Sequence, residues 1–173
     1  MLFNFKGVFE KLMEKNLYNL FDGFDLIDKA DLVLKFALLY KDYLNRPQTY
    51  EGFTKLNMLE MHVLTSIFRS PGITASDLAQ NWNRTLSLIS QITSKLKKAG
   101  LIYTTKSSKG KGFYNIYVTE EGKHLSHLHI ANDINDVSNS MSYLLKYCSP
   151  EALDNFYLVL KHYIDLLLID IKN

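Results

Sequence analysis

The chain has 173 residues, of which 47% are apolar and 22% charged, with a net charge of +2. This composition is typical of a globular protein and argues against a disordered chain. Only 8 glycines and 3 prolines occur, which favours long helices. No segment has the ~20 consecutive apolar residues of a membrane span, and the N-terminus lacks a secretory signal pattern. The single cysteine, Cys148, agrees with a reducing compartment, so we expect a cytoplasmic protein.

Positive charge is concentrated in the central third of the sequence. Residues 66–123 carry nine basic and three acidic side chains, whereas residues 1–65 and 124–173 are mildly acidic. Such a concentration is typical of a module that binds a polyanion. A solvated basic face is the alternative, and charge alone does not decide between them.

The N-terminal third predicts helices. Apolar residues recur at helical spacing over residues 5–21 and again from Leu26 to Tyr40. Asn45-Arg46-Pro47 ends the second run, because proline disfavours helix in the residue before it.

Three shorter helices are predicted next. Asn57-Met-Leu-Glu60 and Thr74-Ala-Ser-Asp77 each have the pattern of a capped helix start. A third helix is expected from about Leu86 to Ala99, closed by Gly100.

The pattern then changes to β-branched and aromatic residues. Residues 101–106 and 113–118 predict two strands joined by a polar, glycine-containing turn, which together form a β-hairpin. Thr119 is expected to cap a long helix to about Tyr147, and Ser149-Pro150 to start the last helix.

This order predicts a mainly α fold with a small β-hairpin: a winged helix-turn-helix flanked by long N- and C-terminal dimerisation helices. We assign residues 1–56 to N-terminal helices that form part of the dimerisation region. Residues 57–122 are the winged helix DNA-binding domain, and residues 123–173 are the C-terminal dimerisation helices.

The segment from Asn57 to Leu125 resembles the winged helix of MarR-family transcription regulators. The matching residues are Pro71-Gly-Ile-Thr-Ala-Ser-Asp-Leu-Ala79, Ile89-Ser90, Lys95-Leu-Lys-Lys-Ala-Gly-Leu-Ile102 and Val118-Thr-Glu-Glu-Gly122. The resemblance implies a homodimer that binds double-stranded DNA. Family wings usually carry an arginine that enters the minor groove, whereas this wing has Lys109-Gly-Lys111. Lysine suits phosphate contacts better than a narrow groove.

The helix at 86–99 is the expected reader of DNA sequence. Its outward face offers short polar side chains and no acidic residue, as a helix in the major groove requires. A solvated helix rich in Ser and Thr is the alternative. The expected DNA-binding residues are Arg84, Thr85, Ser87, Leu88, Ser90, Gln91, Ser94, Lys95, Lys106, Lys109 and Lys111.

Effector and metal sites are less defined by the sequence. Small-molecule sensing is implied by the resemblance alone, and a pocket would be lined by Tyr40, Tyr43, Phe53, Met58 and His62. Glu120, His124 and His127 share one helix face at a spacing that suits Zn²⁺. A helix with solvated histidines is the alternative, and we expect no cofactor.

We therefore predict a sequence-specific transcription regulator, a repressor that acts as a homodimer on a palindromic operator and responds to a ligand. No phosphate-binding glycine loop, nucleophile elbow or HExxH motif occurs in the sequence, so we expect no enzyme and no membrane partner. The alternatives are a winged-helix protein–protein adaptor and a non-sequence-specific architectural DNA-binding protein.

Overall fold

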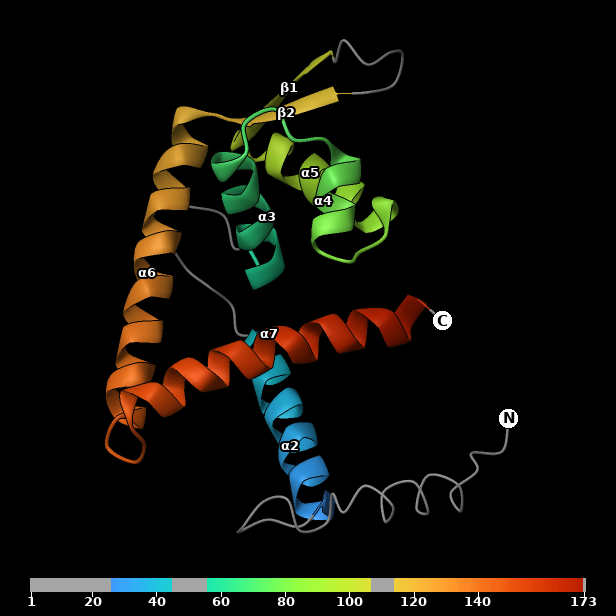
Figure 1. Cartoon of the computed structure of the whole chain (residues 1–173). Coiled ribbons are helices and arrows are strands. Elements are labelled where there is room, and N and C mark those ends of the chain that lie inside the picture. The colour runs from blue at the N-terminus through green and yellow to red at the C-terminus, as the bar shows by residue number, and fades with distance from the viewer. Residues whose placement is uncertain (1–25, 45–55, 107–113, 173) are drawn as a thin grey trace. The chain divides into compact units, whose positions relative to one another are not determined.

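The computed structural model describes residues 26–44, 56–106 and 114–172 (Figure 1). The chain forms two compact units, residues 1–48 and 49–173. The first contains α2, which spans Leu26–Leu44; the helix predicted over residues 5–21 lies outside the described residues. Within the described segments, no helix combines the length and apolarity needed to cross a bilayer.

The second unit has the predicted order of elements. It contains α3 (Met58–Arg69), α4 (Ala75–Asn81), α5 (Leu86–Lys98), β1 (Ile102–Lys106), β2 (Tyr114–Val118), α6 (Glu120–Leu144) and α7 (Pro150–Lys172). The predicted fold class, a mainly helical chain with one hairpin, is confirmed.

The helix starts follow from local side-chain chemistry. Asn57 caps α3 and Thr74 caps α4, each in a reciprocal capping box with the carboxylate three residues on. Each such cap stabilises its helix by about 1 kcal/mol. Gly100 follows α5 with φ of 72°, the left-handed conformation that glycine adopts at little cost.

The hairpin pairs β1 with β2 in antiparallel register, with Thr104 opposite Ile116. Ile73 makes an additional antiparallel bridge to Ile116, and the Ile116 amide donates a hydrogen bond of 3.0 Å to the Ile73 carbonyl. The segment before α4 is thereby attached to the wing, so that the hairpin and the helices form one body.

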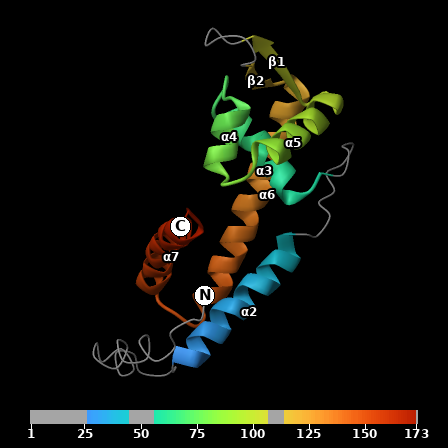
Figure 2. The ribbon, with the colours of Figure 1, turned by 90° about the vertical axis from the view of Figure 1, so that its right-hand side faces the viewer.

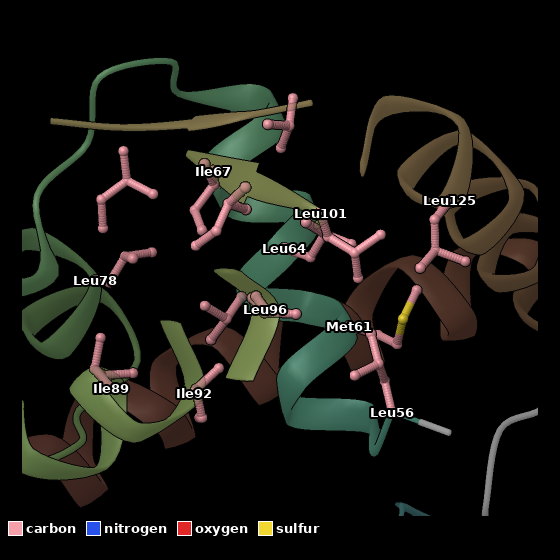
Figure 3. Close-up of a cluster of buried hydrophobic side chains, with 14 residues drawn as sticks. Leu56, Met61, Leu64, Ile67, Leu78, Ile89, Ile92, Leu96, Leu101 and Leu125 are labelled. Carbon is pink, nitrogen blue, oxygen red and sulfur yellow. The ribbon is translucent and has the colours of Figure 1, made fainter. Parts of the chain in front are cut away.

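Among the described residues, a cluster of buried hydrophobic side chains joins α3, α4, α5, the hairpin and the start of α6 (Figure 3). Met61, Leu64 and Ile67 of α3 lie at its centre and are fully buried. Ile89, Ile92 and Leu96 of α5 pack against them from one side, and Leu125 of α6 from the other. In Figure 1, α3 accordingly lies between α6 and the α4–α5 pair.

The junction between the winged helix and α6 is tight. The Thr119 hydroxyl donates to the Gly100 carbonyl at 2.7 Å, and the Thr119 amide donates to the Leu101 carbonyl at 3.0 Å. A Cβ on Gly122 would lie 2.0 Å from the Leu101 oxygen. Only glycine therefore lets the first turn of α6 approach the backbone at the start of the wing.

Beyond its first turns, α6 extends past the ends of α3, α4 and α5 (Figure 2). We call residues 130–172 the C-terminal arm. Apolar side chains of this arm are widely exposed, including Ile134 at 62%, Val159 at 63% and Ile164 at 49%. Leu153, near the start of α7, is buried. The arm thus contrasts with the winged helix, where most aliphatic side chains are enclosed in the core.

Candidate nucleic-acid interface

The α5 helix has one buried face and one polar face. Thr85 caps it, with its side-chain oxygen accepting from the Leu88 amide at 3.2 Å. Ile89, Ile92 and Leu96 are buried at the spacing of a single helix stripe. The other face carries no carboxylate between residues 86 and 99, so nothing on it repels a phosphate.

A shallow groove follows this polar face. It is lined by Ser87, Ser90, Gln91, Ser94, Lys95 and Lys98, and all six side chains belong to exposed residues. Five of the six were predicted from the sequence as DNA-binding residues. The structure therefore gathers the predicted hydroxyl and amide groups on one accessible strip of the helix.

Leu88 does not share that exposed position. It is half-buried and packs against the hydrophobic core, four residues before Ile92 on the same helix side. The exposed leucine of this helix is Leu86, at 52%. Leu86 is thus the more accessible of the two leucines, and DNA contact by Leu88 stays a prediction; the i+4 spacing from Leu88 to Ile92 was the signal for its partial burial.

Lys95 has a partner within the protein. Its ammonium group lies 2.6 and 2.8 Å from the two carboxylate oxygens of Glu60 on α3. Glu60 is buried and also accepts the Asn57 amide in the α3 capping box. Because a buried carboxylate requires a compensating charge, this pair fixes α5 on the start of α3. Lys95 therefore has a positioning role within the protein, and its role as a DNA contact stays a prediction.

Other cations remain accessible near α5. Arg84 is exposed and hydrogen-bonds only weakly to its neighbour's carbonyl, at 3.3 Å. Lys98 and Lys106 are exposed, whereas Lys97 donates to the Thr104 hydroxyl of β1 at 3.0 Å. Lys109 and Lys111 lie outside the described residues.

A second groove runs between α4, α5 and the hairpin. It brings together side chains that were not predicted from the sequence, because they come from three separate segments and show no common spacing. They are Thr74, Ala75, Ser76, Leu86, Thr93, Lys97, Thr104, Tyr114 and Ile116, beside the predicted Ser90 and Ser94. Ser76 and Tyr114 are exposed and could contact a polyanion's backbone.

The effector-pocket candidates are divided between the two units. Tyr40 and Tyr43 lie on α2, with their ring centroids 5.9 Å apart, whereas Met58 and His62 lie on α3. Phe53 lies outside the described residues. The effector pocket stays a prediction.

The metal candidates chosen from the sequence are not brought together. Glu120 binds Lys123 at 2.6 Å, the His127 ring packs on Phe68, and His124 is exposed. A different group among the described residues has metal-ligating geometry, namely His62, His129 and Asp133. The sequence carries little sign of it, because its members lie on two helices far apart in the chain.

His129 is the buried member of this group. Burial lowers the pKa of its imidazole below the ordinary value, the neighbouring His62 lowers it further, and the Asp133 carboxylate opposes both. Its Nε2 atom lies 3.4 Å from Asp133 Oδ2, and burial outweighs this attraction. The imidazole is therefore kept neutral under ordinary conditions.

Comparisons with known proteins support a winged helix in the segment that contains α3, α4, α5 and β1. The MarR family model matches residues 56–111, which hold α3, α4, α5 and β1. YhjH of Bacillus subtilis (strain 168), an uncharacterized HTH-type transcriptional regulator, is 25% identical over 134 residues, or 66% of this chain and 77% of that protein. Over residues 56–111 the chain is therefore similar to MarR-family regulators.

Solved structures share the fold of this chain at low sequence identity. Streptococcus pneumoniae FabT, solved in complex with DNA, has a TM-score of 0.64 at 17% identity and covers 81% of this chain and 97% of its own. The S. aureus MepR–DNA complex has a TM-score of 0.63 at 20% identity and covers 80% and 97%. The MarR resemblance predicted from the sequence is confirmed over residues 56–111, and the fold shared with these two structures covers about four fifths of the chain.

Proposed function

We propose that this chain is a DNA-binding transcription regulator that reads its operator with the polar face of α5. The observation that carries the proposal is the exposed, carboxylate-free strip of α5, with Ser87, Gln91 and Ser94 at its centre. A glutamine can pair with both edge groups of adenine, and a serine can reach either kind of base. The MarR family model supports the same class of function.

The basic side chains around α5 would supply most of the affinity. Arg84, Lys98 and Lys106 are exposed beside the polar strip, and Lys109 and Lys111 belong to the wing segment. Each cation that neutralises a phosphate releases counterions, so binding should weaken steeply with salt. The wing lysines are proposed as phosphate contacts with no direct role in sequence choice.

Homodimer formation is the second part of the proposal. Apolar side chains are exposed along α7 at Phe156, Tyr157, Ile164 and Leu167. A soluble chain seldom leaves so wide an apolar stripe against water, and a second copy would cover it with matching residues. Two copies would place two α5 helices on a palindromic operator about one helical turn apart.

We further propose that the protein acts in the cytoplasm as a repressor, with no catalytic activity of its own. Response to a small-molecule effector belongs to this proposal as well. Its support is the MarR family model over residues 56–111.

The test is a DNA selection on the purified full-length protein, followed by affinity measurements across a salt series. We expect one enriched palindromic sequence bound with submicromolar affinity. Gln91→Ala should lower affinity for that site by about 1–3 kcal/mol while leaving nonspecific binding unchanged. Lys161→Ala, an exposed change on α7, is the matched control and should alter neither.

Two results would contradict the proposal. Weak binding to every duplex, insensitive to Gln91→Ala, would indicate an architectural DNA-binding protein. Absence of DNA binding at low salt would indicate a winged-helix adaptor.

A further inference from the structure

Three side chains with metal-ligating atoms meet where α3 packs on α6. His62 comes from α3, and His129 and Asp133 come from α6, where they are separated by one turn. His129 Nε2 lies 3.4 Å and His62 Nδ1 lies 4.0 Å from the same oxygen, Oδ2 of Asp133. The three ligand atoms all lie within 4.8 Å of one another.

The separations between these ligand atoms are close to those found between the ligand atoms of a bound cation. Zn²⁺ binds imidazole nitrogen and carboxylate oxygen at about 2.0–2.2 Å, and tetrahedral bonds of that length place neighbouring ligand atoms about 3.4 Å apart. The His129–Asp133 distance already has this value. Only the His62 side chain must move by roughly an ångström, and it is half-exposed and has room to do so.

Neighbouring rings restrict how far the two imidazoles can turn. The His129 ring is fully buried. The His62 and His129 rings meet edge to face, with centroids 4.8 Å apart. The Trp82 ring lies 5.6 Å from the His62 ring and limits how far that imidazole can turn away.

A purely structural explanation accounts for only part of the group. An (i, i+4) contact between His129 and Asp133 would suffice to satisfy a buried imidazole on α6. That contact does not require the His62 imidazole of α3 to approach the same carboxylate oxygen. Two nitrogen ligands and one oxygen ligand converging from two helices constitute a donor set for borderline divalent metals such as Zn²⁺.

We propose that His62, His129 and Asp133 bind one divalent transition-metal ion of the Zn²⁺ type. The side chains of His62 and Asp133 are 34% and 38% exposed, which leaves solvent access for entry and for a water ligand in a fourth position. The ion would join α3 of the winged helix to α6. The proposal goes beyond the proposed function and does not depend on it, because metal binding is measured without DNA.

The experiment is a titration of the chelator-treated full-length protein with Zn²⁺, followed by calorimetry, and with Co²⁺, followed by its visible absorption. We expect one ion per chain, a tetrahedral or five-coordinate Co²⁺ spectrum, and a Tm that rises with Zn²⁺ concentration. Asp133→Asn and His62→Gln alter half-exposed side chains and should fold. Each should raise the Kd for Zn²⁺ at least about tenfold, since removing a ligand costs no less than removing an outer-shell partner.

The matched controls are His124→Gln and His127→Gln, which change exposed histidines of α6 outside the group. They should leave the Kd, the stoichiometry and the Co²⁺ spectrum unchanged. Loss of binding in these two variants, with full binding in Asp133→Asn, would overturn the proposal. So would a parent protein with no stoichiometric Zn²⁺ binding at micromolar concentration.

Discussion

The winged helix and the C-terminal arm both carry stripes of apolar side chains, but these are buried in the winged helix and exposed in the arm. In the winged helix, Leu64, Ile89 and Leu96 are fully enclosed by residues of the same chain. In the arm, Leu158, Val159 and Ile164 remain about half exposed or more. Periodicity predicts a helix in both regions, because the spacing of apolar residues reports which side is buried, not which molecule buries it. The core of the winged helix is therefore buried within one chain, whereas in the proposed homodimer a second copy would cover the apolar stripe of the arm.

The largest effect is expected from opening the enclosed core. Leu64→Ala removes buried methyl groups from the centre of α3 and should lower the free energy of unfolding by about 2–5 kcal/mol. Chemical denaturation at several protein concentrations measures this, and the decrease should be the same at each. Leu158→Ala, the same change at a residue 55% exposed in the arm, is the comparison. A decrease as large and as independent of concentration in that variant would show that the arm is also buried within one chain.

The next effect concerns assembly through the arm. Ile164→Glu places a carboxylate in the apolar stripe of α7, where burial against a second copy would strongly disfavour the charge. We expect the dimer Kd to rise at least about tenfold, or about 1.4 kcal/mol, in sedimentation experiments. His162→Glu introduces the same charge at an exposed residue on the opposite side of α7 and serves as control. An unchanged Kd for Ile164→Glu would exclude this stripe as the interface.

A smaller effect should follow from separating α5 from α3. Lys95→Met leaves the buried Glu60 carboxylate without its ammonium partner and should destabilise the winged helix by about 1–3 kcal/mol. Because Lys95 is engaged by Glu60, the salt dependence of DNA binding should keep its slope. Lys106→Ala, at an exposed residue, should reduce that slope by about 0.9 for each phosphate that is no longer neutralised. A slope reduced equally by Lys95→Met would return Lys95 to the DNA-binding residues.

The smallest effect is a pH dependence located at the α3–α6 contact. Burial lowers the pKa of His129 in the folded chain, so below about pH 6.5 the unfolded chain takes up a proton that the folded chain does not. The free energy of unfolding should therefore fall as the pH drops through that value and continue falling toward the folded pKa. Denaturation of the metal-free protein between about pH 5 and pH 8 covers this range. His129→Gln should make the free energy of unfolding depend less on pH in this range. An equally steep dependence in that variant would show that another group is responsible.

The sequence was most informative where structure is local. The capping boxes at Asn57 and Thr74, the pairing of β1 with β2 and the glycine after α5 all depend on residues that are close together in the sequence. Each was predicted nearly to the residue. The polar strip of α5 was predicted for the same reason, because helix geometry assigns faces from spacing alone.

The sequence was least informative about contacts between distant helices. Glu60 meets Lys95 and His62 meets His129 across gaps of 35 and 67 positions in the printed sequence. Neither pairing has a periodic pattern, because each depends on how α3 is placed between α5 and α6. Leu88 illustrates an intermediate case: its spacing from Ile92 indicated the buried side, but the edge of an apolar stripe is hard to locate without the packed neighbours.

The joint at Thr119 and Gly122 has a mechanical consequence. It connects the end of α5 and the start of the wing to a helix of 25 residues by two hydrogen bonds and a backbone approach with no room for a methyl group. At 1.5 Å per residue, α6 is about 37 Å long, so a tilt of about 5° at this joint displaces its far end by about 3 Å. The helix therefore behaves as a lever with a stiff pivot. A small rotation of the winged helix about this joint would become an ångström-scale translation at the far end of α6, and a displacement of that end would return as a rotation of α5.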